Sequence, residues 1–158
     1  MIHVALVSPE IPWNTGNSGR SALAAGAQLH LVRPLGFALT ERELKRAGLD
    51  YWQHVGARVW GSWDEFERAI PEMGEPYFFS ARAEREYWDV DYPRDCVLVF
   101  GSERTGLPDG VRERYAERLI RMPIASPHVR SLNLSTAVGV ALYEVLRQQR
   151  EGGPAARP

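Results

Sequence analysis

The sequence has few of the features that mark secreted, membrane-spanning or disulfide-stabilised proteins. It contains one cysteine, Cys96, so no internal disulfide can form. No apolar run is long enough to cross a membrane, and the N-terminus, MIHVALVSPE, lacks the basic lead of a signal peptide. Of the 19 basic residues only Lys45 is a lysine. We therefore expect a cytoplasmic protein that makes no use of a membrane.

Charge and metal ligands are also sparse. A net charge of −1 argues against a protein that coats nucleic acid by bulk attraction, although a local basic patch remains possible. His54 and His128 are not spaced with carboxylates or Cys96 as a metal site requires, whereas His3 and His30 lie in apolar runs where packing is the expected role. We therefore predict no metal site, and we expect Cys96 to be an inert buried side chain.

The apolar segments alternate between short strand-like runs and helix-like runs. The expected strands are residues 2–7, 28–33, 57–60, 77–80, 96–100 and 119–122, and the expected helices are 21–27, 41–48, 63–70, 111–116 and a long one after 131. This order predicts an α/β fold with a mainly parallel sheet and helices on both faces. Residues 1–150 then form a single domain, and 151–158 form a flexible tail.

Three polar loops rich in glycine, asparagine or serine follow strands of this sheet, at residues 9–20, 101–108 and 123–133. Ligands of parallel sheets bind at the carboxyl ends of the strands, so we expect the loops to form one composite site. Taken alone, each loop is more often a structural turn than a site.

Known phosphate-binding motifs do not explain these loops. Gly101 and Gly106 have the separation of a phosphate loop, but Leu107 and Pro108 replace the required Lys-Ser/Thr. The three-glycine fingerprint of dinucleotide sites is also missing after the first strand. Backbone amides near Gly101 and Leu132, beside apolar side chains, are instead compatible with an adenosine-like ligand.

Together the three loops resemble the motifs of the SPOUT superfamily of RNA methyltransferases. The first motif is Asn14-Thr-Gly-Asn17 with Arg20, the second is FGSERTGLP at 100–108, and the third combines IRMP at 120–123 with RSLNLS at 130–135. The chain is most similar to the short tRNA wobble-nucleotide 2′-O-methyltransferases, through the pattern EIPxNTGN, through LGFAL at 35–39 and through KRAGLDY at 45–51.

The resemblance implies a C-terminal deep trefoil knot, a homodimer, S-adenosylmethionine as cofactor and tRNA as partner. The reaction would methylate the ribose 2′-hydroxyl of a wobble cytidine or modified uridine, in leucine tRNAs. By motif position, the catalytic candidates are Arg20, Glu103 and Asn133, and the cofactor-binding candidates are Phe79, Gly101, Met122, Ser131 and Leu132. Candidates for RNA binding are Arg42, Lys45, Arg46 and Arg130 as a phosphate patch, and Tyr143 as an RNA or dimer contact.

Several alternatives stay open at this point. The substrate could be another tRNA position or a ribosomal RNA, or the chain could be a catalytically silent knotted domain that binds RNA or a nucleotide. The usual assignment in the family would make Arg20 the general base. A guanidinium group keeps its proton, so we prefer a role in holding phosphate and stabilising the alkoxide. Trp13 replaces a more usual small or polar residue, and residues 81–95 match the family poorly.

Overall fold

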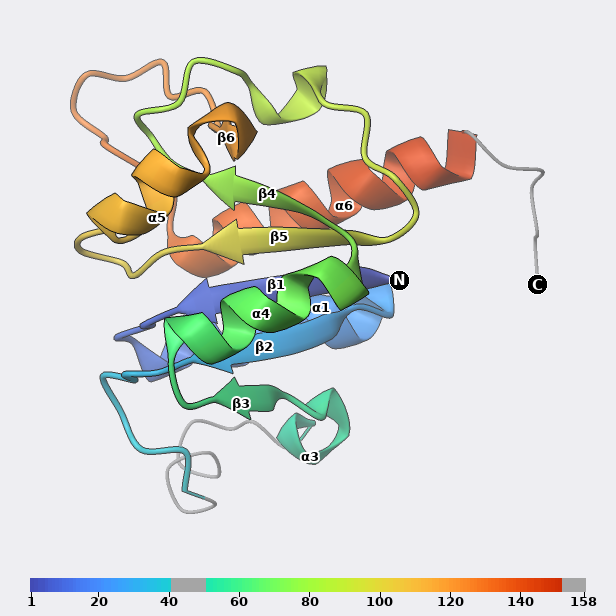
Figure 1. The fold of residues 1–158 in the computed structure, drawn as a ribbon, viewed down its shortest axis with the longest axis vertical. Coiled ribbons are helices and arrows are strands. Elements are labelled where there is room, and N and C mark those ends of the chain that lie inside the picture. Colours follow the sequence, from blue (N-terminus) through green and yellow to red (C-terminus); the bar gives the residue numbers. More distant parts are fainter. Residues whose placement is uncertain (41–50, 152–158) are drawn as a thin grey trace.

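The structure is a computed structural model that describes residues 1–40 and 51–151 (Figure 1). Its strands are β1 (Ile2–Val7), β2 (Gln28–Val32), β3 (Arg58–Trp60), β4 (Glu75–Phe79), β5 (Cys96–Phe100) and β6 (Leu119–Ile120). Its α-helices are α1 (Pro12–Ala25), α3 (Trp52–Val55), α4 (Trp63–Met73), α5 (Asp109–Arg114) and α6 (Leu134–Glu151), and two short 3₁₀ helices are η1 (Tyr87–Asp89) and η2 (Ala116–Arg118).

The six strands form one sheet in the order β3-β2-β1-β5-β4-β6, and every pairing is parallel. The arrowheads of β1, β4 and β5 accordingly point to the same side in Figure 1. The expected parallel sheet of six strands is therefore confirmed. The central β5 is buried along its whole length, which is why CVLVF reads as one apolar run.

Helices cover both faces of the sheet. Leu98 and its alternate neighbours face a cluster that includes Ala22 of α1 and Val138 of α6. Val97 and Val99 face the opposite cluster, which includes Phe66 of α4 and Val111 of α5. Because successive strand residues point to opposite faces, a sheet covered twice needs apolar residues at every position. The two-faced arrangement expected from the sequence is confirmed.

The segment 9–20 differs from the expected loop, because helix α1 begins at Pro12 and includes most of it. Proline at the first helical position has the backbone angle that the helix needs. Gly19 lies inside the helix, and a Cβ there would stand 2.8 Å from Cζ3 of Trp52, so the absence of a side chain lets the two helices pack closely. The helix ends at Gly26, which adopts a left-handed conformation with φ 68°. The glycines thus serve helix packing and helix termination.

Other boundaries shift by a few residues. Helix α4 continues beyond residue 70 to Met73, β6 ends at Ile120, and α5 starts at Asp109. The expected helix at 41–48 and the last seven residues of the expected tail lie outside the described part of the chain. These shifts leave the order of elements, and therefore the position of the three loops, unchanged.

Candidate functional site

The three polar segments meet around one cavity of about 570 Å³ at the carboxyl edge of the sheet. Asn14 at the start of α1, Gly101 after β5 and Ser131 before α6 all line it. In Figure 1 these segments gather on the side toward which the strands point. The convergence expected from the sequence is confirmed, although the first segment is a helix start and not a loop.

A chain of side-chain hydrogen bonds joins the three segments. The Glu103 carboxylate accepts from the backbone N–H of Glu10 (2.7 Å), from that of Ile11 (3.1 Å) and from Nδ2 of Asn14 (3.1 Å). Asn133 Nδ2 in turn donates to Asn14 Oδ1 at 2.9 Å. A carboxylate next to the first N–H groups of a helix is also favoured by the helix dipole. Glu103 therefore fixes the start of α1 against the loop after β5.

Asn133 has a second function at the start of α6. Its Oδ1 accepts from the backbone N–H of Ser135 (3.0 Å) and of Thr136 (3.3 Å), which is the geometry of an N-cap. Both ends of the amide are thus occupied, so the side-chain orientation is fixed by its partners. Asn133 therefore positions α6 and Asn14 together.

Gly101 allows two stretches of backbone to cross. A Cβ at this position would lie 2.0 Å from the carbonyl carbon of Gly106 and 2.1 Å from the backbone nitrogen of Leu107. The turn is closed by hydrogen bonds between the backbones of Ser102 and Gly106 in both directions, at 3.2 and 2.9 Å. Gly106 adopts φ 69°, which glycine accepts without strain. Any side chain at 101 would collide with backbone and force the turn open.

One wall of the cavity is apolar. The rings of Phe79 and Phe100 stack with centroids 4.3 Å apart and an interplanar angle of 11°. Leu134 continues this wall from α6. All five residues assigned to cofactor binding line the cavity, namely Phe79, Gly101, Met122, Ser131 and Leu132. Apolar walls beside a few polar groups suit an organic ligand with a planar ring, and the cavity volume suits a small molecule. Their role in holding a cofactor stays a prediction.

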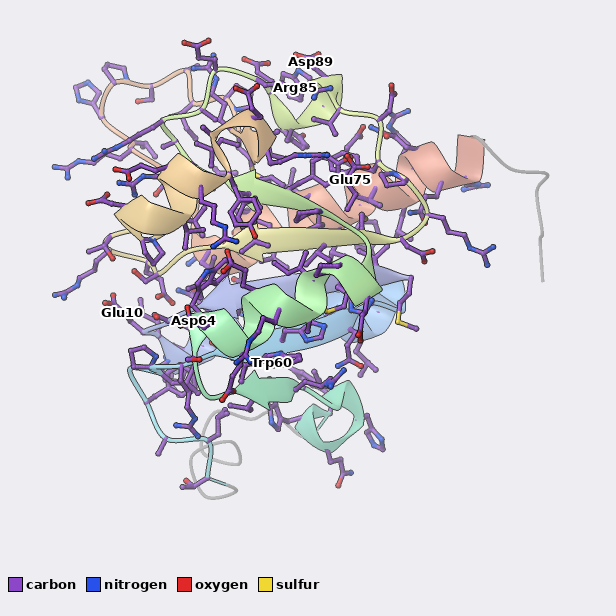
Figure 2. All side chains as sticks on the ribbon, in the orientation of Figure 1. Glu10, Trp60, Asp64, Glu75, Arg85 and Asp89 are labelled. Carbon is purple, nitrogen blue, oxygen red and sulfur yellow. The ribbon has the colours of Figure 1, made fainter. Side chains whose placement is uncertain are left out.

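Four arginines also line the cavity, and they differ in how their charges are used. Arg104 pairs with Glu10, and Arg112 pairs with Asp109. Figure 2 shows Glu10 near the end of β1 on the same side of the sheet. Within the described residues, the guanidinium groups of Arg82 and Arg130 have no partner, and both side chains are exposed. These two cations are available to an anionic ligand.

Arg82 was missed by the sequence analysis, because residues 81–95 lack any usable periodicity. A usable signal was present, since residue 82 follows the carboxyl end of β4 just as the other loops follow their strands. The same position explains why Ser80 and Ala81 line the cavity. The rule that ligands bind at strand ends, applied to every strand, would have found this segment.

Arg20 does not line the cavity of its own chain. It lies exposed on α1, with its guanidinium carbon 5.7 Å from the ring centroid of Tyr51. Tyr143 is exposed on α6. Arg42, Lys45 and Arg46 lie outside the described residues. The structure thus gathers two of the three catalytic candidates, Glu103 and Asn133, and leaves Arg20 outside.

The largest shift in a histidine pKa lies away from the cavity, in a buried group that joins three strands. Burial, with smaller effects of nearby His3 and Arg58, lowers the pKa of His30 from 6.5 to about 3. Trp60 Nε1 donates to His30 Nδ1 at 3.0 Å, and His30 Nε2 lies 2.9 Å from His3 Nδ1. The indole N–H fixes the neutral tautomer of His30 with its proton on Nε2. Both histidines serve packing, as expected.

Other chemical groups were also located. Burial raises the pKa of the Cys96 thiol to about 11, in agreement with an unreactive side chain. Among the described residues, no cluster of histidine, cysteine or carboxylate side chains is arranged to hold a metal ion. No described helix is both long and apolar enough to cross a membrane.

Comparison with known proteins identifies close relatives. The profile of the SpoU rRNA Methylase family matches residues 1–143. A Burkholderia ambifaria protein named tRNA (cytidine(34)-2′-O)-methyltransferase is 44% identical over 97% of this chain and 99% of its own length. A solved structure that concerns the 2-OH methylation of C/U34 on tRNA has a TM-score of 0.88 and 46% identity, covering 96% of this chain and 97% of that one. An rRNA methyltransferase from Sinorhizobium meliloti with AdoMet bound has a TM-score of 0.78 and 28% identity, covering 98% of this chain and 57% of that one.

Proposed function

Because the chain belongs to the SpoU rRNA methylase family, we propose that it methylates the ribose 2′-hydroxyl of the wobble nucleotide of a tRNA. The named activity of a relative that matches almost end to end supports this substrate over a ribosomal one. The observation that carries the proposal is the hydrogen-bonded chain Glu103–Asn14–Asn133, which joins all three sequence motifs at a single cavity. Leucine tRNAs with cytidine or a modified uridine at that position are the proposed targets.

S-adenosylmethionine is the proposed methyl donor. Three features of the cavity suit it: the tight backbone turn at Gly101, where a side chain would collide with backbone, the apolar side chains of Phe79 and Met122, and polar groups around Ser131. When bound, the cofactor supplies an electrophilic methyl carbon on a sulfonium centre. The protein has to align the ribose oxygen with that carbon and stabilise the negative charge that develops on the oxygen.

Arg20 is the proposed source of that stabilisation. A guanidinium group donates hydrogen bonds and has no acceptor atom, so Arg20 is proposed to bind a phosphate or the developing alkoxide and not to act as the base. Since it lies outside the cavity of its own chain, a second copy would have to present it. We propose a homodimer through the outer faces of α1 and α6, where Leu23, Val140 and Tyr143 are exposed. Apolar side chains on packed neighbouring helices suit such a contact.

The C-terminal part is proposed to form the deep trefoil knot of the family. Strand β6 pairs with β4 at the edge of the sheet, and the chain then returns as α6, which packs against α1. The connector at 81–95 is bound to α6, because the Tyr92 N–H donates to Gln148 Oε1 at 3.0 Å and Gln148 Nε2 donates to the Val90 carbonyl at 2.9 Å. This binding of the connector across α6 supports a threaded path. Residues 1–150 would act as one domain.

The proposal is tested by incubating the protein with isotope-labelled S-adenosylmethionine and total tRNA, followed by nucleoside analysis and mapping. We expect 2′-O-methylcytidine or a 2′-O-methylated uridine at the wobble position of leucine tRNAs. Label at another tRNA position, or only in ribosomal RNA added in parallel, would contradict the substrate. Binding of the cofactor by calorimetry without any labelled RNA would contradict the enzymatic activity itself.

A further inference from the structure

Trp13 is the tryptophan that the fold does not use. Each of the other four has a partner: Trp60 donates to His30, Trp63 contacts aromatic rings, Trp52 packs against Gly19, and Trp88 contacts the Tyr87 ring. Within the described residues, Trp13 has no ring contact and no hydrogen bond, and 56% of it is exposed. Covering an exposed indole ring with a ligand is energetically favourable, so Trp13 is a candidate for a ligand contact.

Trp13 does not itself line the cavity, but its neighbours in the chain do. It lies in the first turn of α1, between Ile11 and Asn14, and both of these neighbours line the cavity. Ile11 and Asn14 are held by the Glu103 carboxylate, so the backbone that carries the indole is fixed. A rigid aromatic side chain beside a substrate cavity loses little conformational freedom when it binds a ligand.

The exposed face of α1 continues from Trp13 with polar and cationic groups. Asn17 and Arg20 follow at four and seven residues, so all three side chains lie on one side of the helix, and all three are exposed. Helix α1 contains no acidic residue, and Arg20 is its one charged side chain. An aromatic ring in line with a cation matches an RNA strand, whose bases stack and whose phosphates are negative.

We propose that Trp13 stacks on an unpaired base of the RNA substrate, a neighbour of the methylated nucleotide, on the same helix face from which Arg20 reaches the RNA. This inference rests on the proposed function and names a positioning residue for its substrate. Sequence-specific RNA recognition acts mostly on single-stranded loops whose bases can stack on aromatic side chains. The wobble nucleotide lies in such a loop.

A second copy of this chain is the competing occupant of the Trp13 surface. The apolar residue of α1 that suits a dimer is Leu23, which lies ten residues further along, about 15 Å away by helical rise. Trp13 instead lies between two residues that line the cavity, Ile11 and Asn14, and in line with the positive charge of Arg20. The position and charge of this end of α1 therefore favour an RNA base over an apolar protein surface.

The test compares Trp13→Leu with Trp88→Leu, because Trp88 is exposed to a similar extent (49%) on η1. We expect Trp13→Leu to raise KM and Kd for a leucine tRNA anticodon stem-loop about 5- to 100-fold, with kcat changed less than KM, because loss of one stacked base has this effect. Trp13→Phe should retain most of the affinity, since a phenyl ring still stacks. Trp88→Leu should bind as wild type. The cofactor Kd should be the same in all three variants.

Three outcomes would overturn the proposal. The first is unchanged RNA affinity in Trp13→Leu. The second is an RNA defect that appears together with dissociation of the protein to monomers in sedimentation, which assigns Trp13 to contact between copies. The third is an equal loss in Trp13→Phe and Trp13→Leu. Failure of the wild-type protein to bind any tRNA would instead reject the proposed function, and the stacking role with it. Circular dichroism and thermal unfolding confirm that each variant is folded.

Discussion

Two chains of side-chain hydrogen bonds, each built from three residues, lie in different regions of this protein. Glu103, Asn14 and Asn133 connect a loop, a helix start and a second helix start at the carboxyl edge of the sheet. His3, His30 and Trp60 connect β1, β2 and β3, which the parallel ladders already hold side by side. Figure 2 shows Trp60 at the β3 end of the sheet, away from the loops.

The difference lies in what each chain of bonds adds to the backbone. The histidine group reinforces neighbours that backbone hydrogen bonds already fix, so its loss should cost stability and little else. The Glu103 group joins segments through side chains, so its loss should change the shape of the cavity as well. Networks of similar chemistry thus serve the fold in one region and the site in the other.

The largest effect should come from a change at Gly101, in the turn that follows β5. Gly101→Val would push a side chain into the backbone of Gly106 and Leu107 and open the turn. We expect cofactor affinity, measured by calorimetry, to fall at least about 100-fold, a loss of nearly 3 kcal/mol. Gly110→Ala is the matched control, because a Cβ there meets nothing within 4 Å. Wild-type affinity in Gly101→Val would show that the crossing does not shape the site.

Glu103→Gln should show whether the Glu103 network supports the shape of the cavity in addition to the stability of the fold. The carboxylate of Glu103 accepts hydrogen bonds from the backbone N–H groups of Glu10 and Ile11, whereas the amide of glutamine has only one oxygen to accept them. Its NH₂ group would face an N–H group, and at least one donor would be left unpaired at a cost of about 1–3 kcal/mol. We expect both a lower free energy of unfolding in urea and a lower kcat/KM for tRNA. Glu113→Gln, at an exposed position, is the control. A stability loss with kcat/KM intact would make this network equivalent to the histidine one.

The histidine network should respond to pH, and the site should not follow it. Because the pKa of His30 is about 3 in the folded chain and near 6.5 in the unfolded chain, the unfolded chain binds more protons between these values. The contribution to stability is complete above pH 6.5 and is lost as pH falls, at up to about 1.4 kcal/mol per pH unit. His3, whose pKa is also lowered, adds to this slope.

Urea unfolding from pH 8 to pH 5 measures that slope, and His30→Gln should flatten it. His54→Gln, at an exposed histidine, should leave the slope as it is in the wild type. Cofactor affinity over the same range should show no parallel change while the protein stays folded. A slope that survives in His30→Gln would mean that other groups control the acid sensitivity.

The smallest effect should come from the two unpaired arginines at the cavity. Arg82→Gln should weaken tRNA binding several-fold and reduce the slope of log affinity against log salt by about 1, as expected for the loss of one phosphate contact. Arg104→Gln is the comparison, because Arg104 already pairs with Glu10. Equal salt slopes in both variants would show that internal pairing does not decide which cation binds RNA.

Much of this arrangement could be predicted from the sequence, because its signals are local. The run CVLVF predicts a strand buried on both faces, and its neighbours in the chain predict the parallel sheet. The position of polar loops after strands predicted a shared cavity, now located around Asn14, Gly101 and Ser131. These inferences need only the side-chain periodicity of strands and the direction in which they run.

The parts that could not be predicted depend on tertiary contacts. Gly19 signals a loop by composition, yet it allows α1 to pack against Trp52, a contact visible only in the fold. Arg82 lies in a connector without periodicity, and its place at the cavity comes from the end of β4. His30 has a partner on each neighbouring strand, which no spacing within one strand reveals.

The single amide of Asn133 has a mechanical consequence. It caps α6 with its oxygen and grips Asn14 with its nitrogen, so residues on either side of it cannot shift independently. A ligand that binds against Ser131 and Leu132 would therefore also affect the hydrogen bond from Asn133 that supports the first turn of α1. Coupling between two ligands is reciprocal in their binding free energies. If a methyl donor bound here raises the affinity for RNA by ordering Asn133, RNA must raise the affinity for the methyl donor by the same factor.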